Sequence, residues 1–272
     1  MENYALIGKG ATADVFAWSE GRILKLYKDW MPAIAVEQEY SATRAAQAAG
    51  APVPATYELV EMDGRHGIVF ERIEGISLMA ELLAKPWKLF SIARQLGELH
   101  AQIHEIQAPV ELRTQRQQIK NGIEMTQDIV EAEKQVVQSY LMQLPEGESL
   151  CHGDFHPDNI LLSARGPIII DWMTGSRGHP SADVARTALL FQTAGLPPGV
   201  PVYIRLLINT SRTLLHTIYL NRYLQLHPTE RQEIDRWRLP LIAARLREIK
   251  DYPQEKQRLL VLLKTMLKEQ PQ

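Results

Sequence analysis

The pattern of apolar and polar positions divides the chain into two parts. From residue 3 to about residue 75, short apolar runs alternate with glycine-containing turns, which is typical of β-strands. The runs predict a five-stranded antiparallel sheet, with strands at residues 4–7, 13–18, 23–27, 56–61 and 67–71. One alanine-rich run interrupts them and predicts a helix over residues 32–49, because Gly50 and then Pro52 follow it as helix-ending residues.

Beyond Gly75 the apolar residues recur with the period of an α-helix. Helices are predicted at residues 78–83, 87–106, 113–144, 183–193, 202–226, 230–249 and 253–267. Two apolar patches, at residues 160–162 and 168–170, predict a small hairpin inside this helical part. We therefore expect an α+β fold with a small sheet lobe, residues 1–75, and a larger helical lobe, residues 76–272. The cleft between two such lobes is a common ligand site.

Composition and charge narrow the class of protein. The 272 residues are 45% hydrophobic and 23% charged, as in ordinary globular proteins. A net charge of -2 argues against a nucleic-acid partner, and a single cysteine cannot form an internal disulfide or a cysteine-based zinc site. The first residues do not resemble a secretory signal. Residues 202–226 look apolar but include arginines, which are costly in a bilayer, so they predict a buried helix instead of a membrane span. We therefore expect a cytoplasmic protein without a membrane partner.

The strongest chemical signal is residues 151–160, with the sequence CHGDFHPDNI, followed by Asp171 at the end of the hairpin. Asp154, Asn159 five residues later, and Asp171 after the next strand form the pattern by which phosphotransferases orient a hydroxyl and ligate a metal ion. A tight Gly-Asp turn capped by asparagine is the alternative interpretation of the loop, and Asp171 disfavours it.

Lys25 is a cation inside an apolar strand, where an unpaired charge is costly. Phosphates and a carboxylate are suitable partners, and the following helix offers Glu37 and Glu39. The alternative is that Lys25 lies on a solvated face of its strand.

Residues 8–15, with the sequence GKGATADV, lie between the first two predicted strands. Gly8 and Gly10 let backbone N–H groups approach phosphate oxygens closely, and Val15 would then cover an adenine ring. On its own such a segment is more often only a turn, so the phosphate-binding interpretation depends on the other segments that follow in order.

Taken in order, these segments resemble the aminoglycoside phosphotransferase and choline kinase family, which is protein-kinase-like, up to about residue 195. The resemblance implies a bilobal kinase-like fold and an ATP or GTP cofactor with Mg²⁺. It makes Asp154 the catalytic base, and Asn159 and Asp171 the Mg²⁺ ligands. His152 and Asp183 are then structural supports of the catalytic loop.

The same resemblance bears on the nucleotide site. The spacing to residues 50–54, with the sequence GAPVP, favours Glu39 over Glu37 as the partner of Lys25. Residues 69–75 become the hinge, with backbone contacts to adenine at Glu71 and Ile73. Trp172 stands where protein kinases carry phenylalanine, which is normal in this family.

His100 and His104 lie four residues apart and could ligate a metal ion from one face of a helix. The acid of an H-E-x-x-H motif is absent, which favours a packed core pair.

The length of the segment from Asp171 to Asp183 indicates the class of phosphoryl acceptor. Asp183 comes twelve residues after Asp171, too few for the loop that holds a peptide in protein kinases, and Gly153 replaces the arginine that reads an activating phosphate. We expect a small-molecule alcohol, aminoglycoside-like, choline-like or sugar-like, and no activation by phosphorylation. Excess basic residues after Val200 weigh against a polycation, whereas the acidic stretch 111–148 leans the other way. The alternative is a catalytically silent nucleotide-binding regulator, which the joint presence of the site residues disfavours.

Overall fold

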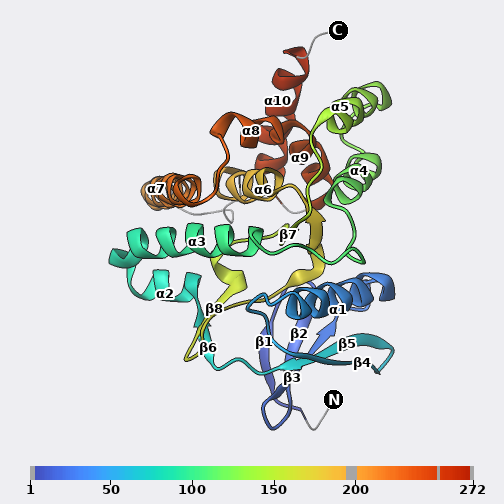
Figure 1. The fold of residues 1–272 in the computed structure, drawn as a ribbon, viewed down its shortest axis with the longest axis vertical. Helices are drawn as coiled ribbons and strands as arrows, with labels where there is room; N and C mark the ends of the chain where they lie inside the picture. Colours follow the sequence, from blue (N-terminus) through green and yellow to red (C-terminus); the bar gives the residue numbers. More distant parts are fainter. Residues whose placement is uncertain (1–3, 194–200, 250–251, 270–272) are drawn as a thin grey trace.

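A computed structural model describes residues 4–193, 201–249 and 252–269 of the chain. It has the two expected parts, an antiparallel sheet at the bottom of Figure 1 and a helical part above it. Helix α3 lies across the middle of this view, and α1 lies between the sheet and the helical part. The α+β bilobal fold predicted from the sequence is confirmed.

In the described residues the N-terminal sheet has five strands in the order β1-β2-β3-β5-β4, each pair antiparallel. The bounds of these strands are β1 Leu6–Lys9, β2 Ala13–Ser19, β3 Arg22–Tyr27, β4 Thr56–Met62 and β5 Arg65–Glu71. Val15 pairs with Lys25, and Ala13 with Tyr27, so these four side chains share one face. Helix α1, Ala33–Ala48, covers that face, and its Val36 is buried in the same cluster as Tyr27.

The helical part is built around one large apolar cluster that includes Trp172, Trp237 and Tyr219. Its helices are α2 Leu78–Ala84, α3 Leu89–His104, α4 Gln115–Met125, α5 Glu131–Gln143, α6 Pro180–Thr193, α7 Val202–Leu226, α8 Arg231–Arg236, α9 Arg238–Arg245 and α10 Pro253–Lys268. Single 3-10 turns are η1 Pro86–Lys88, η2 Pro157–Asn159, η3 Trp172–Thr174 and η4 Leu246–Glu248.

Short strands in this part frame the loops that contain the predicted site residues. The predicted hairpin is present as β8, Ile160–Ser163, and β9, Gly166–Ile169. The pattern analysis missed β6, Gly75–Ser77, which pairs with β8, and also β7, Ser149–Cys151, which pairs with β10, Ser176–Gly178. Strands of three residues are too short to show an alternating pattern, and their partners are far away in the sequence.

Two predicted helices are each divided in the structure. Residues 113–144 form α4 and α5, separated at Thr126, whose backbone is extended and whose hydroxyl donates to Asp128. Local hydrogen bonds of this kind compete with the helical ladder. Residues 230–249 form α8, α9 and η4, because Pro240 has no N–H and cannot continue the ladder from α8.

Helix α7 has the predicted bounds, but the expectation that it is buried is wrong for its first half. Tyr219 and Tyr223 are fully buried against α3, whereas Val202 is 79% exposed and Tyr203 is 74% exposed. The neighbouring helix α3 covers only the later turns. No helix in the described ranges is long and apolar enough to cross a membrane.

Candidate active site

The loop after β7 carries the residues of the strongest sequence signal. Gly153 has a φ of +78°, a conformation that residues with a Cβ rarely adopt. A Cβ at this position would also lie 2.8 Å from the carbonyl oxygen of Thr174. The glycine is therefore required both for the turn and for the close approach of the η3 segment.

Asp183, in the first turn of α6, supports this loop from below. Its carboxylate accepts the N–H of His152 at 2.6 Å and the N–H of Gly153 at 2.8 Å. Burial would raise the pKa of Asp183, but hydrogen bonds from His100 and His104 hold it well below its usual range. The side chain is thus a buried anion fixed to the backbone of the loop.

His100 and His104 complete the surroundings of Asp183. Their Nε2 atoms lie 3.2 and 3.3 Å from its Oδ2, and their Nδ1 atoms contact the hydroxyls of Tyr219 and Tyr223 at 2.6 and 2.8 Å. One ligand atom from each imidazole and one from the Asp183 carboxylate lie within 4.8 Å of one another, which is close enough for all three to bind one metal ion. Contacts with the tyrosines and the carboxylate already account for their arrangement, so we regard the pair as part of the core.

Asp154 extends from the loop with its side chain 35% exposed. Its Oδ2 lies 3.4 Å from Nε2 of His156, and its backbone carbonyl accepts the side-chain amide of Asn159 at 2.9 Å. Burial alone would raise the pKa of Asp154, but the hydrogen bond and charge of His156, together with the charge of Arg186, lower it to about 2. The carboxylate is ionised at neutral pH and accessible to a ligand.

Lys25 and Asp171 meet across the two parts of the chain. Nζ of Lys25 lies 2.6 Å from Oε1 of Glu39 and 3.2 Å from Oδ1 of Asp171. The structure thus brings Glu39, not Glu37, beside Lys25, and Tyr27 donates its hydroxyl to the same Glu39. Burial alone would lower the pKa of Lys25, but Glu39 and Asp171 raise it, so the ammonium stays charged.

Ile170 joins the two groups of residues. Its N–H donates to the carbonyl of Asn159 at 2.9 Å, and its own carbonyl contacts Nε2 of His152 at 3.0 Å. The next residue, Asp171, has a φ of +66°, which is unusual for a residue with a side chain and turns the chain directly after β9. The position of Asp171 is consequently fixed by contacts with the loop of residues 152–159.

The residues suit a magnesium ion. Asn159 uses its NH₂ group on Asp154, which leaves its amide oxygen available, and the Asp171 carboxylate is 37% exposed. Carboxylate and amide oxygens are ligands that Mg²⁺ prefers.

Backbone N–H groups that could bind a ligand occur both in the glycine-containing loop, residues 8–15, and in the hinge, residues 69–75. Gly10 donates its N–H to the carbonyl of Ala13 at 2.8 Å, so the N–H groups of Ala11 and Thr12 are the ones without a hydrogen bond in the described chain. Glu71 binds Arg165 at 2.7 Å and accepts the N–H of Ala55. Ile73 lies just beyond β5, and its peptide groups make no hydrogen bond within the described residues.

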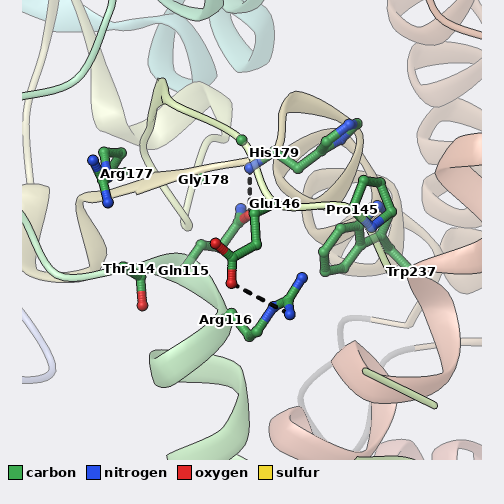
Figure 2. Close-up of a pocket in the computed structure, with 10 residues that line it drawn as sticks. Thr114, Gln115, Arg116, Pro145, Glu146, Arg177, Gly178, His179 and Trp237 are labelled. Carbon is green, nitrogen blue, oxygen red and sulfur yellow. Dashed lines mark hydrogen bonds and ion pairs between the residues drawn. The ribbon is translucent and has the colours of Figure 1, made fainter. Parts of the chain in front are cut away.

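A separate hollow is lined by residues of α4, of β10 and of the segment before β7 (Figure 2). Its cavity volume is only about 20 Å³, and Gln115, His179 and Trp237 are among its lining residues. Gln115 accepts the N–H of His179, and Arg116 pairs with Glu146, as the dashed lines show. None of the predicted site residues lines this hollow.

Sequence reasoning missed three residues that hold the site together. Thr174 donates its hydroxyl to the carbonyl of His152 at 2.9 Å, and Arg186 donates Nε to the carbonyl of Gly153 at 2.9 Å. Arg113 bridges Gln38 of α1 and the carbonyl of Met173. Contacts from a side chain to a carbonyl leave no sequence pattern, although Arg186 lies one helical turn after Asp183.

A two-lobed fold with a lysine–glutamate pair in the sheet lobe and an Asp, Asn and Asp set in the helical lobe defines the class of kinase-like phosphotransferases. The profile of the Phosphotransferase enzyme family matches residues 3–217, and the chain belongs to this family. No curated protein sequence matches the chain significantly.

Solved structures agree on the fold. Aminoglycoside phosphotransferase APH(4)-Ia has a TM-score of 0.65 at 16% identity, covering 96% of this chain and 93% of its own. Amicoumacin kinase hAmiN, in complex with AMP-PNP, Ca²⁺ and Ami, gives 0.59 at 14% identity, with 99% and 89% covered. A choline/ethanolamine kinase family protein from Mesorhizobium loti gives 0.59 at 16% identity, with 98% and 88% covered.

Proposed function

We propose that the chain is an ATP- and Mg²⁺-dependent kinase that transfers the γ-phosphate to a hydroxyl of a small molecule, in the cytoplasm. Residues 1–75 would bind the nucleotide, and residues 76–272 would carry the catalytic and acceptor sites. The observation that carries the proposal is the continuous set of contacts from Glu39 through Lys25 to Asp171, which Ile170 connects to Asn159 and the Asp154 loop.

Each charged group has a role in this proposal. Lys25 neutralises phosphate oxygens of the nucleotide, held in place by Glu39. Asn159 and Asp171 would hold Mg²⁺, which when bound would neutralise the charge that develops on the phosphates. Gly8 and Gly10 would cover the phosphates, Val15 would cover the adenine, and the backbone at Glu71 and Ile73 would contact the adenine edge.

Asp154 orients the acceptor. Its ionised carboxylate accepts a hydrogen bond from the acceptor hydroxyl and takes the proton as the oxygen bonds to the γ-phosphorus. The bond between the γ-phosphorus and the bridging oxygen breaks, and the nucleoside diphosphate leaves with that electron pair. A carboxylate with a pKa of about 2 is a weak base, so its main contribution is orientation of the hydroxyl.

A small acceptor is supported by the segment from Asp171 to Asp183, which packs as η3 and β10 against the catalytic loop. It leaves no extended platform for a peptide. Among the neighbours, a thermostable mutant of APH(4)-Ia has been crystallised with ADP and hygromycin B, and hAmiN is an amicoumacin kinase. Small hydroxyl compounds of these kinds are the first acceptors to test.

The test of the catalytic assignment is Asp154→Asn. We expect turnover to fall by at least about 10²-fold, with Mg²⁺-ATP affinity nearly unchanged, because the variant keeps the shape and loses the charged acceptor of the hydroxyl proton. Asp158→Asn is the matched control, since its carboxylate in the same loop contacts Ser77 instead. Full activity of Asp154→Asn would exclude Asp154 as the orienting group.

ATP consumption should be screened with aminoglycosides, choline, amino sugars, nucleosides and macrolides. We expect one class to be phosphorylated by the wild-type protein and not by Asp154→Asn. Tight Mg²⁺-ATP binding without turnover on any class would instead favour a silent nucleotide-binding regulator. Loss of Mg²⁺-ATP affinity in Asp171→Ala supports the metal assignment, and unchanged affinity contradicts it.

A further inference from the structure

The backbone of the catalytic loop is held at every polar group from residue 152 to residue 154. Asp183 accepts the N–H groups of His152 and Gly153, Thr174 donates to the carbonyl of His152, and Asn159 donates to the carbonyl of Asp154. Two groups are left, and both belong to the peptide that joins Gly153 to Asp154. Its N–H contacts the ring of His152 at 3.2 Å, and its carbonyl accepts Nε of Arg186 at 2.9 Å.

Arg186 is the only side chain in the described residues that holds the carbonyl end of this peptide. Gly153 has no side chain that would restrict rotation, so a peptide released at one end is free to tilt. Such a tilt redirects the bond from Cα to Cβ of Asp154, and with it the carboxylate. The orientation of Asp154 therefore depends on a guanidinium group one turn further along α6.

The other end of Arg186 contacts the C-terminal elements. Nη2 lies 2.7 Å from Oε2 of Glu248 in η4, and Nη1 of Arg245 lies 3.4 Å from the same oxygen. Arg245 also pairs with Glu255 of α10 at 2.6 Å, and Glu255 is 2% exposed. A continuous series of ion pairs thus runs from the catalytic loop through α6 to α9 and α10, beyond the residues that the family profile matches.

The guanidinium is buried and charged. Its side chain is 12% exposed. Burial by itself lowers the pKa of Arg186, but Glu248, Asp154 and Asp183 together raise it above its usual value, with Glu248 contributing most. Removing Glu248 leaves the buried guanidinium of Arg186 with one fewer partner. The guanidinium would then move away from the Gly153 carbonyl.

We propose that Arg186 is a positioning residue for phosphoryl transfer, which fixes the Gly153–Asp154 peptide and makes its orientation depend on Glu248 and the C-terminal helices. The proposal rests on the proposed kinase function for its catalytic consequence. Its structural consequence, the stability of one peptide plane, holds whether or not the acceptor is known.

The experiment compares Arg186→Gln, Glu248→Gln, the double variant and a matched control. Arg222→Gln is that control, because Arg222 of α7 pairs with Glu98 of α3 at the same distance of 2.7 Å, in a half-buried ion pair without contact to the loop. Amide exchange of a peptide spanning residues 150–156, kcat, KM for each substrate and the Tm are measured for all four.

We expect exchange at the Asp154 amide to rise at least about 10-fold in Arg186→Gln, and kcat to fall by about 10²-fold with the KM for ATP nearly unchanged. Glu248→Gln should show a smaller change in both, and no further change when combined with Arg186→Gln, since it acts through that side chain. Arg222→Gln should resemble the wild type. Guanidinium ions at millimolar concentration should partly restore kcat to Arg186→Ala and not to Asp154→Asn.

Unchanged exchange and kcat in Arg186→Gln would overturn the proposal, as would equal losses in Arg222→Gln, which would indicate a general effect on stability. If Arg186→Gln does not fold, Arg186→Lys keeps the charge and loses the forked geometry, and we expect a smaller rise in exchange from it. A wild-type protein without turnover on any acceptor contradicts the kinase proposal, and the exchange measurement still decides the role of Arg186.

Discussion

At the scale of residues, position 153 tolerates only glycine. Its φ of +78° and the 2.8 Å that a Cβ would have to the Thr174 carbonyl act together. At Gly166, in the β8–β9 turn, φ is +97° but no atom lies within 4 Å of such a Cβ. A substitution at Gly166 would therefore cause backbone strain alone, whereas one at Gly153 would cause both backbone strain and a steric conflict.

We expect Gly153→Ala to lower the free energy of unfolding by about 1–3 kcal/mol and kcat by at least about 10-fold, because the alanine must displace η3 or distort the loop. Gly166→Ala is the control and should lower stability by about 1 kcal/mol through strain alone, with kcat unchanged. Urea unfolding and steady-state kinetics measure both effects. Equal kcat values for the two variants would contradict this role for Gly153.

At the scale of elements, the segment from Asp171 to Asp183 is closed where protein kinases have a regulated loop. Its hydroxyl groups are those of Thr174, Ser176 and Ser181. Thr174 donates to the carbonyl of His152, Ser176 is buried against β7, and Ser181 is buried and contacts Thr229. A phosphate on any of them would have to open the packing of the loop.

We therefore expect the protein to be fully active without phosphorylation. Protein made in a kinase-free cell-free system should have the same kcat as protein from cells, and peptide libraries should remain unlabelled. Mass spectrometry should find no phosphate on the three hydroxyls. A phosphate at one of them, whose removal abolishes activity, would point to a regulated protein kinase with a short loop.

For the whole molecule, buried and half-buried histidines determine how stability responds to acid. Histidines whose pKa is lowered by burial are His100, His104, His152, His179, His216 and His227. For His104 the pKa falls to about 4, with a further contribution from the nearby His100. An unfolded chain binds protons on these rings near pH 6.5, whereas the folded chain does not. Stability is thus complete above about pH 6.5 and is lost as the pH falls toward 4.

His104 alone should remove about 2 kcal/mol from the free energy of unfolding between pH 7 and pH 5. His156 opposes the trend, because Asp154 raises its pKa in spite of burial. Urea unfolding at the two pH values measures the loss. In His104→Gln, which has no group titrating there, the difference between pH 5 and pH 7 should shrink by about the same amount. An unchanged difference would show that His104 is protonated in the folded protein.

The sequence by itself determined the order of the elements and the identity of the residues that carry charge in the site. Alternating apolar residues suffice for the five strands of the sheet, because each strand has one face toward a core. Asp154 and Asn159 are close in sequence, so their spacing in the loop is a local property. Lys25 signals a partner because a cation in an apolar strand requires one.

Tertiary structure decided which side chains meet over long distances in the chain. Glu39 rather than Glu37 lies beside Lys25 because α1 turns that face toward β3, and α7 is half exposed because α3 covers only its later turns. Arg186 contacts Gly153 and Glu248 across dozens of residues, through a carbonyl and an ion pair that no local pattern records. The periodicity of apolar residues indicates which face of a helix or strand is apolar. Only tertiary packing determines what that face, and the charged residues beside it, contact.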